Sequence, residues 1–88
     1  MGEARQSVEI VNRRGLHARA SAKFVGAVAV LPEGVKVTVS KPPHSAAGGS
    51  ILGLMMLGAA KGDTVEVAVE GDGADGVLAE LVALIADG

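Results

Sequence analysis

The sequence predicts an α+β fold, an open-faced two-layer sandwich in which three helices cover one face of an antiparallel sheet of three to four strands. Apolar and polar residues alternate in three separate segments, which is the period of strands with one buried face. Apolar residues recur at helical spacing in the segments between and after these strands. Because each strand keeps one polar face, we expect the helices to pack on the opposite face only.

Each element of the first half follows from a local pattern. Residues 7–11 alternate and predict a strand, and residues 12–15 carry the turn signal that follows it. A helix is expected from residue 16 to about residue 29, ended by Pro-Glu-Gly at 32–34. Five apolar residues at helical spacing are expected to form its one buried face: Ala20, Phe24, Ala27, Val28 and Leu31. Residues 35–40 alternate valine with polar residues and predict the next strand.

The second half adds a loop, two helices and a strand. Residues 41–49 predict a loop with at most a short edge strand, because the two prolines in this segment cannot donate ladder hydrogen bonds. Ser50 can cap a short helix over 51–57. Residues 65–70 alternate and predict a strand, and a last helix is expected over 74–86. The apolar face of that helix is made by Val77, Leu78, Leu81, Val82 and Ile85.

Length and composition fit one small domain that spans residues 1–88. A chain of this size buries about 60–65 % of its unfolded surface, and the core must be aliphatic because Phe24 is the only aromatic residue. The absence of cysteine removes disulfides, thiol chemistry and most zinc sites, and it fits a cytoplasmic protein. There is no signal-peptide pattern and no apolar run near the roughly 18 residues of a membrane span, so we expect neither secretion nor membrane insertion.

His17 is the leading candidate for a chemical role. It follows a turn signal and opens the helical pattern, so we expect it at the first turn of that helix. The N–H groups there have no partner within the helix, and the helix dipole adds partial positive charge, which together suit an anion. The same field disfavours imidazolium and favours a neutral, nucleophilic ring. The alternative is a plain polar residue at a helix start.

Basic residues surround His17 in the sequence. Seven basic and three acidic residues give residues 1–44 a net charge of +4, whereas one basic and seven acidic residues give residues 45–88 a net charge of −6. Four of the basic residues lie within six positions of His17: Arg13, Arg14, Arg19 and Lys23. This pattern indicates either a solvated cationic surface or a local field that favours phosphate or an acidic partner. Arg19 and the backbone N–H groups of Ala18 and Arg19 are the candidate phosphate donors.

Residues 51–57 carry no polar side chain, so a short helix here has more apolar side chains than one buried face needs. Some of them are expected to face solvent as a docking surface, and the alternative is that all belong to the core. Ser50 is a candidate phosphorylation site, because new negative charge there would meet the favourable end of the helix dipole; the alternative is a plain helix cap. We expect His44 to be a surface residue, and two distant histidines without cysteine predict no metal site.

Two motifs resemble those of one family. Asn-Arg-Arg-Gly-Leu-His-Ala-Arg at 12–19 resembles the active-site stretch of the HPr family, the histidine-containing phosphocarriers of the bacterial phosphoenolpyruvate-dependent phosphotransferase system. Ser-Ile-Leu-Gly-Leu-Met-Met-Leu at 50–57 resembles the regulatory serine and docking helix of the same family. The separation of the motifs, the total length and the order of elements also match from residue 7 to residue 86. The resemblance implies an HPr-like sandwich of four strands and three helices.

The resemblance also implies a function. Enzyme I would phosphorylate His17 on Nδ1, and His17 would pass the group to an enzyme IIA domain in a sugar-transport or a regulatory, nitrogen-type pathway. Arg19 would steady the phosphoryl group, and Ser50 would be the target of an ATP-dependent HPr kinase/phosphorylase. The docking patch would consist of Ile51, Leu52 and Met55. The chain would be a monomeric carrier with a phosphohistidine intermediate rather than an enzyme that turns over alone, without cofactor, nucleic acid or membrane.

The sequence departs from the family pattern in two places. Ala20 stands where the family commonly has proline, and alanine should preserve the helix because proline there mainly stiffens the first turn. Residues 42–43 and 46–49 stand where the family usually has a hairpin. The sequence therefore does not decide between a sheet of three strands and a sheet of four. His-Ala-Arg-Ala-Ser at 17–21 is similar to versions from proteobacteria that use the pathway for regulation.

Two other classes of protein compete with this interpretation. A non-catalytic regulatory or anion-binding α+β domain would use His17 as a ligand contact, with reversible binding and no covalent phosphate. A nucleic-acid-binding module is disfavoured by the negative net charge and by the lack of aromatic stacking residues beyond Phe24. Neither class explains the His17 and Ser50 motifs together.

Overall fold

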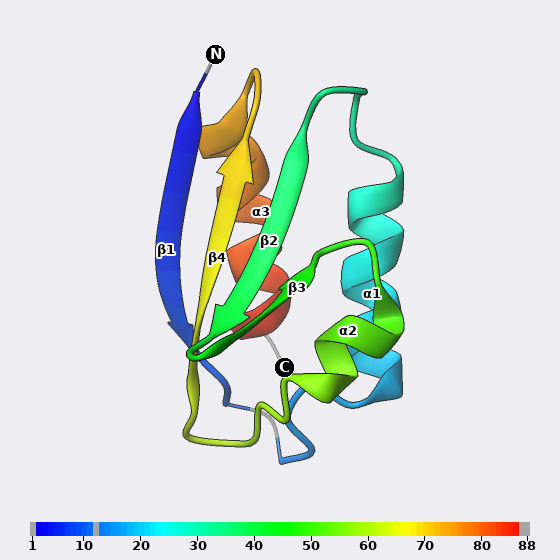
Figure 1. Ribbon diagram of the computed structural model, residues 1–88, viewed down its shortest axis with the longest axis vertical. Helices are drawn as coiled ribbons and strands as arrows, with labels where there is room; N and C mark the ends of the chain where they lie inside the picture. Colours follow the sequence, from blue (N-terminus) through cyan, green and yellow to red (C-terminus); the bar gives the residue numbers. More distant parts are fainter. Residues whose placement is uncertain (1, 12, 87–88) are drawn as a thin grey trace.

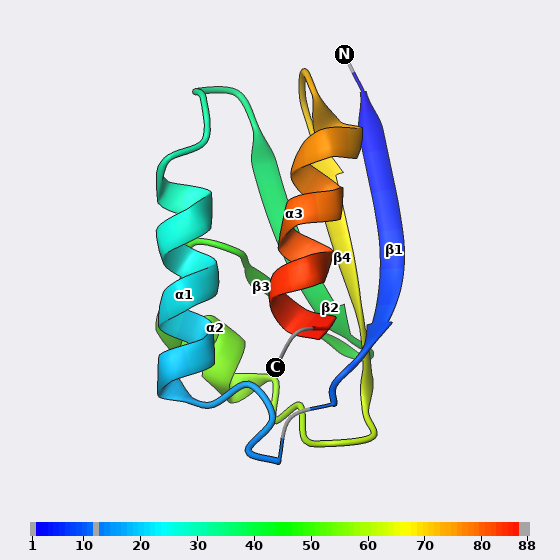
Figure 2. The ribbon, with the colours of Figure 1, turned by 180° about the vertical axis from the view of Figure 1, so that it is seen from behind.

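The computed structural model describes residues 2–11 and 13–86. Its elements in chain order are β1 (Glu3–Glu9), α1 (Ala18–Ala29), β2 (Lys36–Lys41), β3 (His44–Ala47), α2 (Ile51–Met56), β4 (Thr64–Glu70) and α3 (Ala74–Ala86). The four strands form one antiparallel sheet in the order β1-β4-β2-β3. Helices α1 and α3 lie on one face of the sheet and α2 lies against α1 (Figures 1 and 2). The prediction of an open-faced α+β sandwich is confirmed.

The core lies between the sheet and the helices, and the alternation in β4 supplies much of its sheet side. Val65, Val67 and Val69 are at most 1 % exposed, whereas Glu66 and Ala68 between them are partly exposed. Each such valine contributes about 1.5–3 kcal/mol by leaving water. The helices close the core from the other side with Phe24, Leu78, Leu81 and Ile85. Helix α3 therefore presents the predicted apolar face to the sheet.

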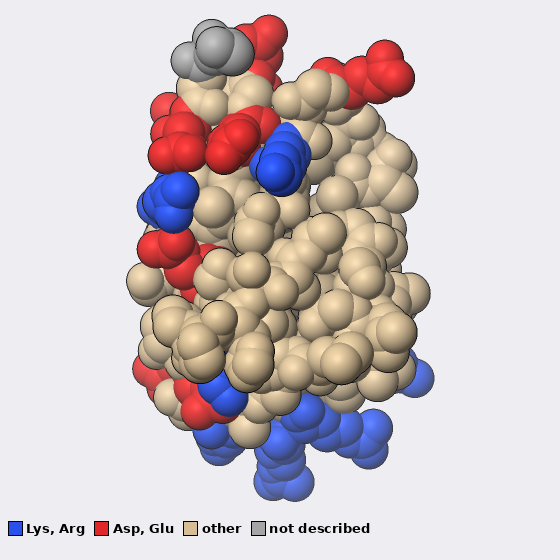
Figure 3. Space-filling view, in the orientation of Figure 1, with Lys and Arg blue, Asp and Glu red and all other residues tan. Residues whose placement is uncertain are grey.

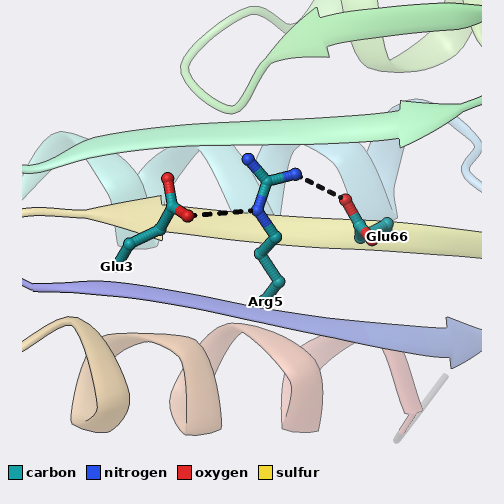
Figure 4. Close-up of polar contacts among 3 residues, drawn as sticks. All are labelled: Glu3, Arg5 and Glu66. Atoms are coloured by element: carbon teal, nitrogen blue, oxygen red, sulfur yellow. Dashed lines mark hydrogen bonds and ion pairs between the residues drawn. The ribbon is translucent and has the colours of Figure 1, made fainter.

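The opposite face of the sheet is polar and open to solvent. Arg5 on β1 reaches across to β4, where Nη1 lies 3.1 Å from Glu66 Oε1, and its Nε lies 3.4 Å from Glu3 Oε1 (Figure 4). These two carboxylates raise the pKa of Arg5, with Glu3 the larger cause. Because all three side chains are exposed, the pairs add little to stability, and they instead give the open face its polar character.

Strand β1 differs from the prediction at both ends. It has seven residues, each paired with β4 from Glu3 opposite Glu70 onward, so the expected strand over 7–11 is wrong in its limits. Pairing along the whole of β4 outweighs the polar local sequence at the start of β1. At the other end, the Ile10 amide donates to the Asp63 carbonyl at 2.8 Å, where the chain leaves the sheet toward α1.

Residues 44–47 form a fourth strand where the sequence predicted a loop with at most a short edge strand. Strand β3 pairs with β2 from Lys41 opposite His44 to Thr38 opposite Ala47. Pro42 and the proline after it lie in the turn between the two strands, where no ladder hydrogen bond is required. The sheet therefore has four strands, and its fourth is the short edge strand.

The helices begin close to the expected residues. Helix α1 starts at Ala18 rather than at residue 16, because His17 is its N-cap, and α2 starts after Ser50 as predicted. The turn expected at 12–15 contains Arg13 and Arg14, and Asn12 lies outside the described residues. Among the helices of the described segments, none combines the length and the apolar character needed to cross a membrane.

Candidate functional site

His17 caps α1 with its own ring. Nδ1 accepts hydrogen bonds from the backbone N–H groups of Arg19 at 3.2 Å and Ala20 at 3.4 Å. An acceptor nitrogen carries no proton, so this geometry assigns the neutral tautomer with hydrogen on Nε2. The ring is half-buried. Its nucleophilic lone pair therefore lies at the electropositive end of the helix.

The two amides that reach the ring are those that an N-cap residue normally binds. They belong to Arg19 and Ala20, whereas the expectation that the Ala18 and Arg19 amides donate to a bound phosphate concerns a different ligand and stays a prediction. An N-cap side chain accepts from the second and third residues of the helix. With Ala18 as the first residue, those positions are Arg19 and Ala20.

The backbone before His17 is held by its neighbours. Gly15 has φ +65°, and the Ala59 carbonyl oxygen stands where a β-carbon at Gly15 would have to be. The buried Leu16 donates its N–H to the same Ala59 oxygen at 3.0 Å and accepts from Ser21 Oγ at 3.3 Å through its carbonyl. These contacts fix the chain on both sides of the peptide that leads into His17.

A hollow of about 410 Å³ opens beside the ring. Its polar wall contains three basic side chains: Arg14, Arg19 and Lys23. Its apolar wall contains Leu16, Phe24 and Leu84. Within the described segments, no carboxylate lines this hollow or pairs with those three cations. Figure 3 shows basic side chains gathered at the end of the molecule where the β1–α1 loop lies. The site has a positive local field.

The apolar helix α2 exposes most of its side chains. Leu52 and Met56 are 69 % and 74 % exposed, Ile51 and Met55 are 42 % and 43 % exposed, and Leu54 is buried. The alternative that all these residues belong to the core is therefore wrong. We call Ile51, Leu52, Met55 and Met56 the α2 apolar surface. Met56 belongs to this exposed surface, whereas the family resemblance implied only Ile51, Leu52 and Met55 as docking residues.

Neither Ser50 nor His44 lines the hollow beside the ring. Ser50 is the N-cap of α2, and its Oγ accepts from the Gly53 N–H at 3.0 Å. His44 is exposed on β3, as expected of a surface residue. No group of three or more metal-ligating side chains occurs in the part of the chain that the structure describes. The site can therefore be built from His17, the α1 amides and the nearby cations.

The fold and the site define a small α+β domain with a neutral histidine at a helix N-terminus, basic surroundings and an exposed apolar helix nearby. The family model described as the PTS HPr component phosphorylation site matches residues 4–87. The chain therefore belongs to the HPr family of phosphocarrier proteins of the phosphotransferase system, and the resemblance drawn from the two motifs is confirmed.

Individual relatives agree with the family assignment. The phosphocarrier protein HPr of Neisseria meningitidis serogroup A is 51 % identical over 71 residues, which cover 81 % of this chain and 75 % of that protein. The HPr of Pseudomonas aeruginosa is 44 % identical over 79 residues, covering 89 % of this chain and 86 % of that protein. The crystal structure of HPr from Bacillus anthracis aligns with a TM-score of 0.86 at 25 % identity, covering 97 % of this chain and 99 % of that one.

Proposed function

We propose that this chain accepts a phosphoryl group from phospho-enzyme I on Nδ1 of His17 and donates it to enzyme IIA domains. The observation that carries the proposal is the orientation of the ring. Nδ1 is unprotonated and lies at the N–H groups of Arg19 and Ala20, beside a hollow with a basic wall. A nucleophile in that position has donors ready for the oxygens of the group that it receives.

The transfer step exchanges one phosphorus–nitrogen bond for another. The ring of His17 swings its lone pair from the helix amides toward the phosphorus of a phosphohistidine on enzyme I. The Nδ1–P bond forms as the donor's P–N bond breaks in line, and that electron pair returns to the donor ring, which leaves as neutral imidazole when its other nitrogen carries a proton. Nε2 of His17 keeps its proton throughout. Releasing the amide contacts at 3.2 and 3.4 Å costs about 1 kcal/mol, the typical contribution of an N-cap.

The phosphorylated ring leaves the α1 amides without their nitrogen acceptor. Phosphoryl oxygens then accept from the N–H groups of Arg19 and Ala20, with the Ala18 N–H as a further donor of the first turn. The forked guanidinium of Arg19 supplies another contact. Because Arg19 is exposed, solvent screens this charge and the group remains transferable to the next protein.

The α2 apolar surface is proposed as the docking surface for both donor and acceptor. Exposed apolar side chains beside a reactive group are typical of protein contact sites, and methionine adapts its packing to more than one partner. Helix α2 packs against α1, the helix that His17 caps, so a protein seated on Leu52 and Met55 would lie next to that helix. The cations beside His17 favour partners with acidic residues around an apolar centre.

Ser50 is proposed as a regulatory phosphorylation site for an ATP-dependent HPr kinase/phosphorylase. A phosphate on Oγ would add about −1.5 to −2 charges at the edge of the α2 apolar surface. The phosphate would be tolerated by the fold because Oγ lies at the N-terminus of α2 and already accepts from Gly53. Docking on enzyme I would be weakened.

We also propose one domain, 1–88, acting as a cytoplasmic monomer in a sugar-transport or nitrogen-type regulatory pathway.

The decisive experiment is intact mass spectrometry after incubation with enzyme I and phosphoenolpyruvate. Wild type should gain one acid-labile phosphoryl group and His17→Ala none, with an active cognate enzyme I as the positive control. Absence of the adduct on wild type would favour the competing class, a non-catalytic anion-binding domain in which His17 is only a ligand contact.

A further inference from the structure

The loop that carries His17 is held by a second loop, residues 57–63, which joins α2 to β4. Backbone hydrogen bonds connect the two loops: Leu16 N to Ala59 O at 3.0 Å, Ile10 N to Asp63 O at 2.8 Å and Gly62 N to Ile10 O at 2.9 Å. They bind the His17 loop near both of its ends. The position of the ring therefore depends on how firmly the second loop is fixed.

The second loop is fixed by a carboxylate and an ammonium group. Asp63 Oδ2 accepts from the Ala60 N–H at 2.9 Å and lies 3.0 Å from Lys41 Nζ. Lys41, at the end of β2, also donates to the Gly58 carbonyl at 3.2 Å. The Ala60 amide is the larger cause and Lys41 a further cause of a lowered pKa for Asp63, so the group stays charged at neutral pH.

We propose that Asp63 is a positioning residue for phosphoryl transfer at His17 and acts together with Lys41 through the α2–β4 loop. This inference rests on the function proposed above for His17. Asp63 fixes the loop, the Ala59 carbonyl fixes the Leu16 amide, and Leu16 directly precedes His17. A displacement of about 1 Å at a reacting atom can cost about 100-fold in rate.

The same loop links the ring to the proposed docking surface. It leaves α2 directly after Met56, the last residue of the α2 apolar surface. Asp63 and Lys41 therefore hold α2 and the His17 loop at a fixed separation. A partner bound on α2 contacts the ring in a defined position only if the distance between α2 and the His17 loop is constant. Asp63 and Lys41 therefore affect the rate of phosphoryl transfer more than the affinity of docking.

The test measures phosphoryl transfer from phospho-enzyme I as a function of carrier concentration. Asp63→Ala should lower the maximal rate about tenfold and change KM less than about twofold, because docking residues are untouched. Asp63→Asn keeps an oxygen for the Ala60 amide and should give an intermediate rate. Glu33→Gln is the matched control, since it removes one carboxylate charge in the α1–β2 loop, which lies at the opposite end of the molecule from the β1–α1 loop (Figure 1), and its rate should equal wild type.

A second readout separates positioning from a purely structural role. The nitrogen-15 chemical shift of Nδ1 in His17 reports its contacts with the α1 amides and should move in Asp63→Ala. All rates are measured at a temperature at which thermal unfolding shows each variant folded. A lower melting temperature with an unchanged maximal rate and an unchanged Nδ1 shift would overturn the inference, and so would a change in KM alone.

The pair is tested by combining Asp63→Ala with Lys41→Gln. If the two act as one unit, the double variant should be no slower than the slower single variant. Additive losses would overturn the joint action of the pair. Wild type that accepts no phosphoryl group would reject the proposed function and this inference with it, whereas equal rates in wild type and Asp63→Ala would reject this inference alone.

Discussion

The carbonyl oxygen of Ala59 occupies the space that a β-carbon would need at Gly15. Gly15 has φ +65°, a conformation that side chains disfavour, so two independent restrictions act at one residue. This contact brings together two loops that are more than forty residues apart in the sequence. It makes the backbone two residues before His17 a part of the site.

Gly15→Ala should lower the free energy of unfolding by about 2 kcal/mol or more, because it adds a steric clash to the strain of a positive φ. Gly34→Ala is the matched control. Gly34 also has a positive φ, of +89°, but nothing lies within 4 Å of the position that a β-carbon would take there. Urea denaturation of both variants isolates the clash, and equal losses would contradict it.

His17→Asn should fold as wild type does and accept no phosphoryl group. Asparagine is a good N-cap, so the Arg19 and Ala20 amides keep an acceptor while the nucleophile is lost. His17→Ala loses both and should be about 1 kcal/mol less stable. Denaturation curves combined with intact mass after treatment with enzyme I check the two properties separately. Phosphorylation of His17→Asn would place the acceptor elsewhere.

Ser50→Asp should keep the stability of α2 and weaken binding to enzyme I. Aspartate still accepts from the Gly53 N–H, but it brings a negative charge to the edge of the α2 apolar surface. Ser50→Asn is the neutral control with the same capping ability. Calorimetric titration with enzyme I should separate the two variants, and equal affinities would argue against a charge-based switch at this residue.

Leu52 and Leu54 should respond in opposite ways to substitution. Leu52 is 69 % exposed, so Leu52→Gln should change stability by less than about 0.5 kcal/mol while lowering affinity for enzyme I about tenfold. Leu54 is 1 % exposed, and Leu54→Ala should cost about 2–5 kcal/mol of stability. Denaturation and binding measured on the same samples test both. Unchanged affinity in Leu52→Gln would remove this residue from the docking surface.

Asp63 should make stability depend on pH in the acid range. Its pKa is lowered by the Ala60 amide first and by Lys41 further. A carboxyl group whose pKa falls on folding contributes stability above its unfolded pKa, near about 4, and loses it as pH falls through the folded value. Asp63→Asn should therefore be less stable than wild type at neutral pH and approach it below about pH 4. A gap that stays constant across this range in urea denaturation would contradict the assignment.

The sequence predicted the elements whose patterns are strong and local. The alternation of Val65, Val67 and Val69 and the apolar stripe of α3 each decide a buried face without help from the rest of the chain. Ser50 likewise carries its capping role in its residue type and position. These elements appear in the structure at or near their predicted limits.

Other features required the tertiary structure. The polar start of β1 is a strand because all seven residues of β1 pair with β4, and no local sequence pattern predicts this pairing. The second amide at the ring belongs to Ala20, whose side chain carries no chemical signal. Asp63 lies in an ordinary turn sequence, and its link to His17 exists only because two distant loops pack together. Such contacts follow from packing and not from periodicity.

The position of the proposed site at one end of the molecule has a kinetic consequence. The molecule measures 34 × 24 × 20 Å, and basic side chains gather at the end where the β1–α1 loop lies (Figure 3). His17 lines the same hollow as Arg14, Arg19 and Lys23. In the proposed relay, a donor and an acceptor that each reach the same half-buried imidazole would be unable to occupy that end together. Donor and acceptor would therefore visit in alternation, with full departure of one before arrival of the other. The whole relay would obey ping-pong kinetics, and an excess of either partner would inhibit it by blocking the common end.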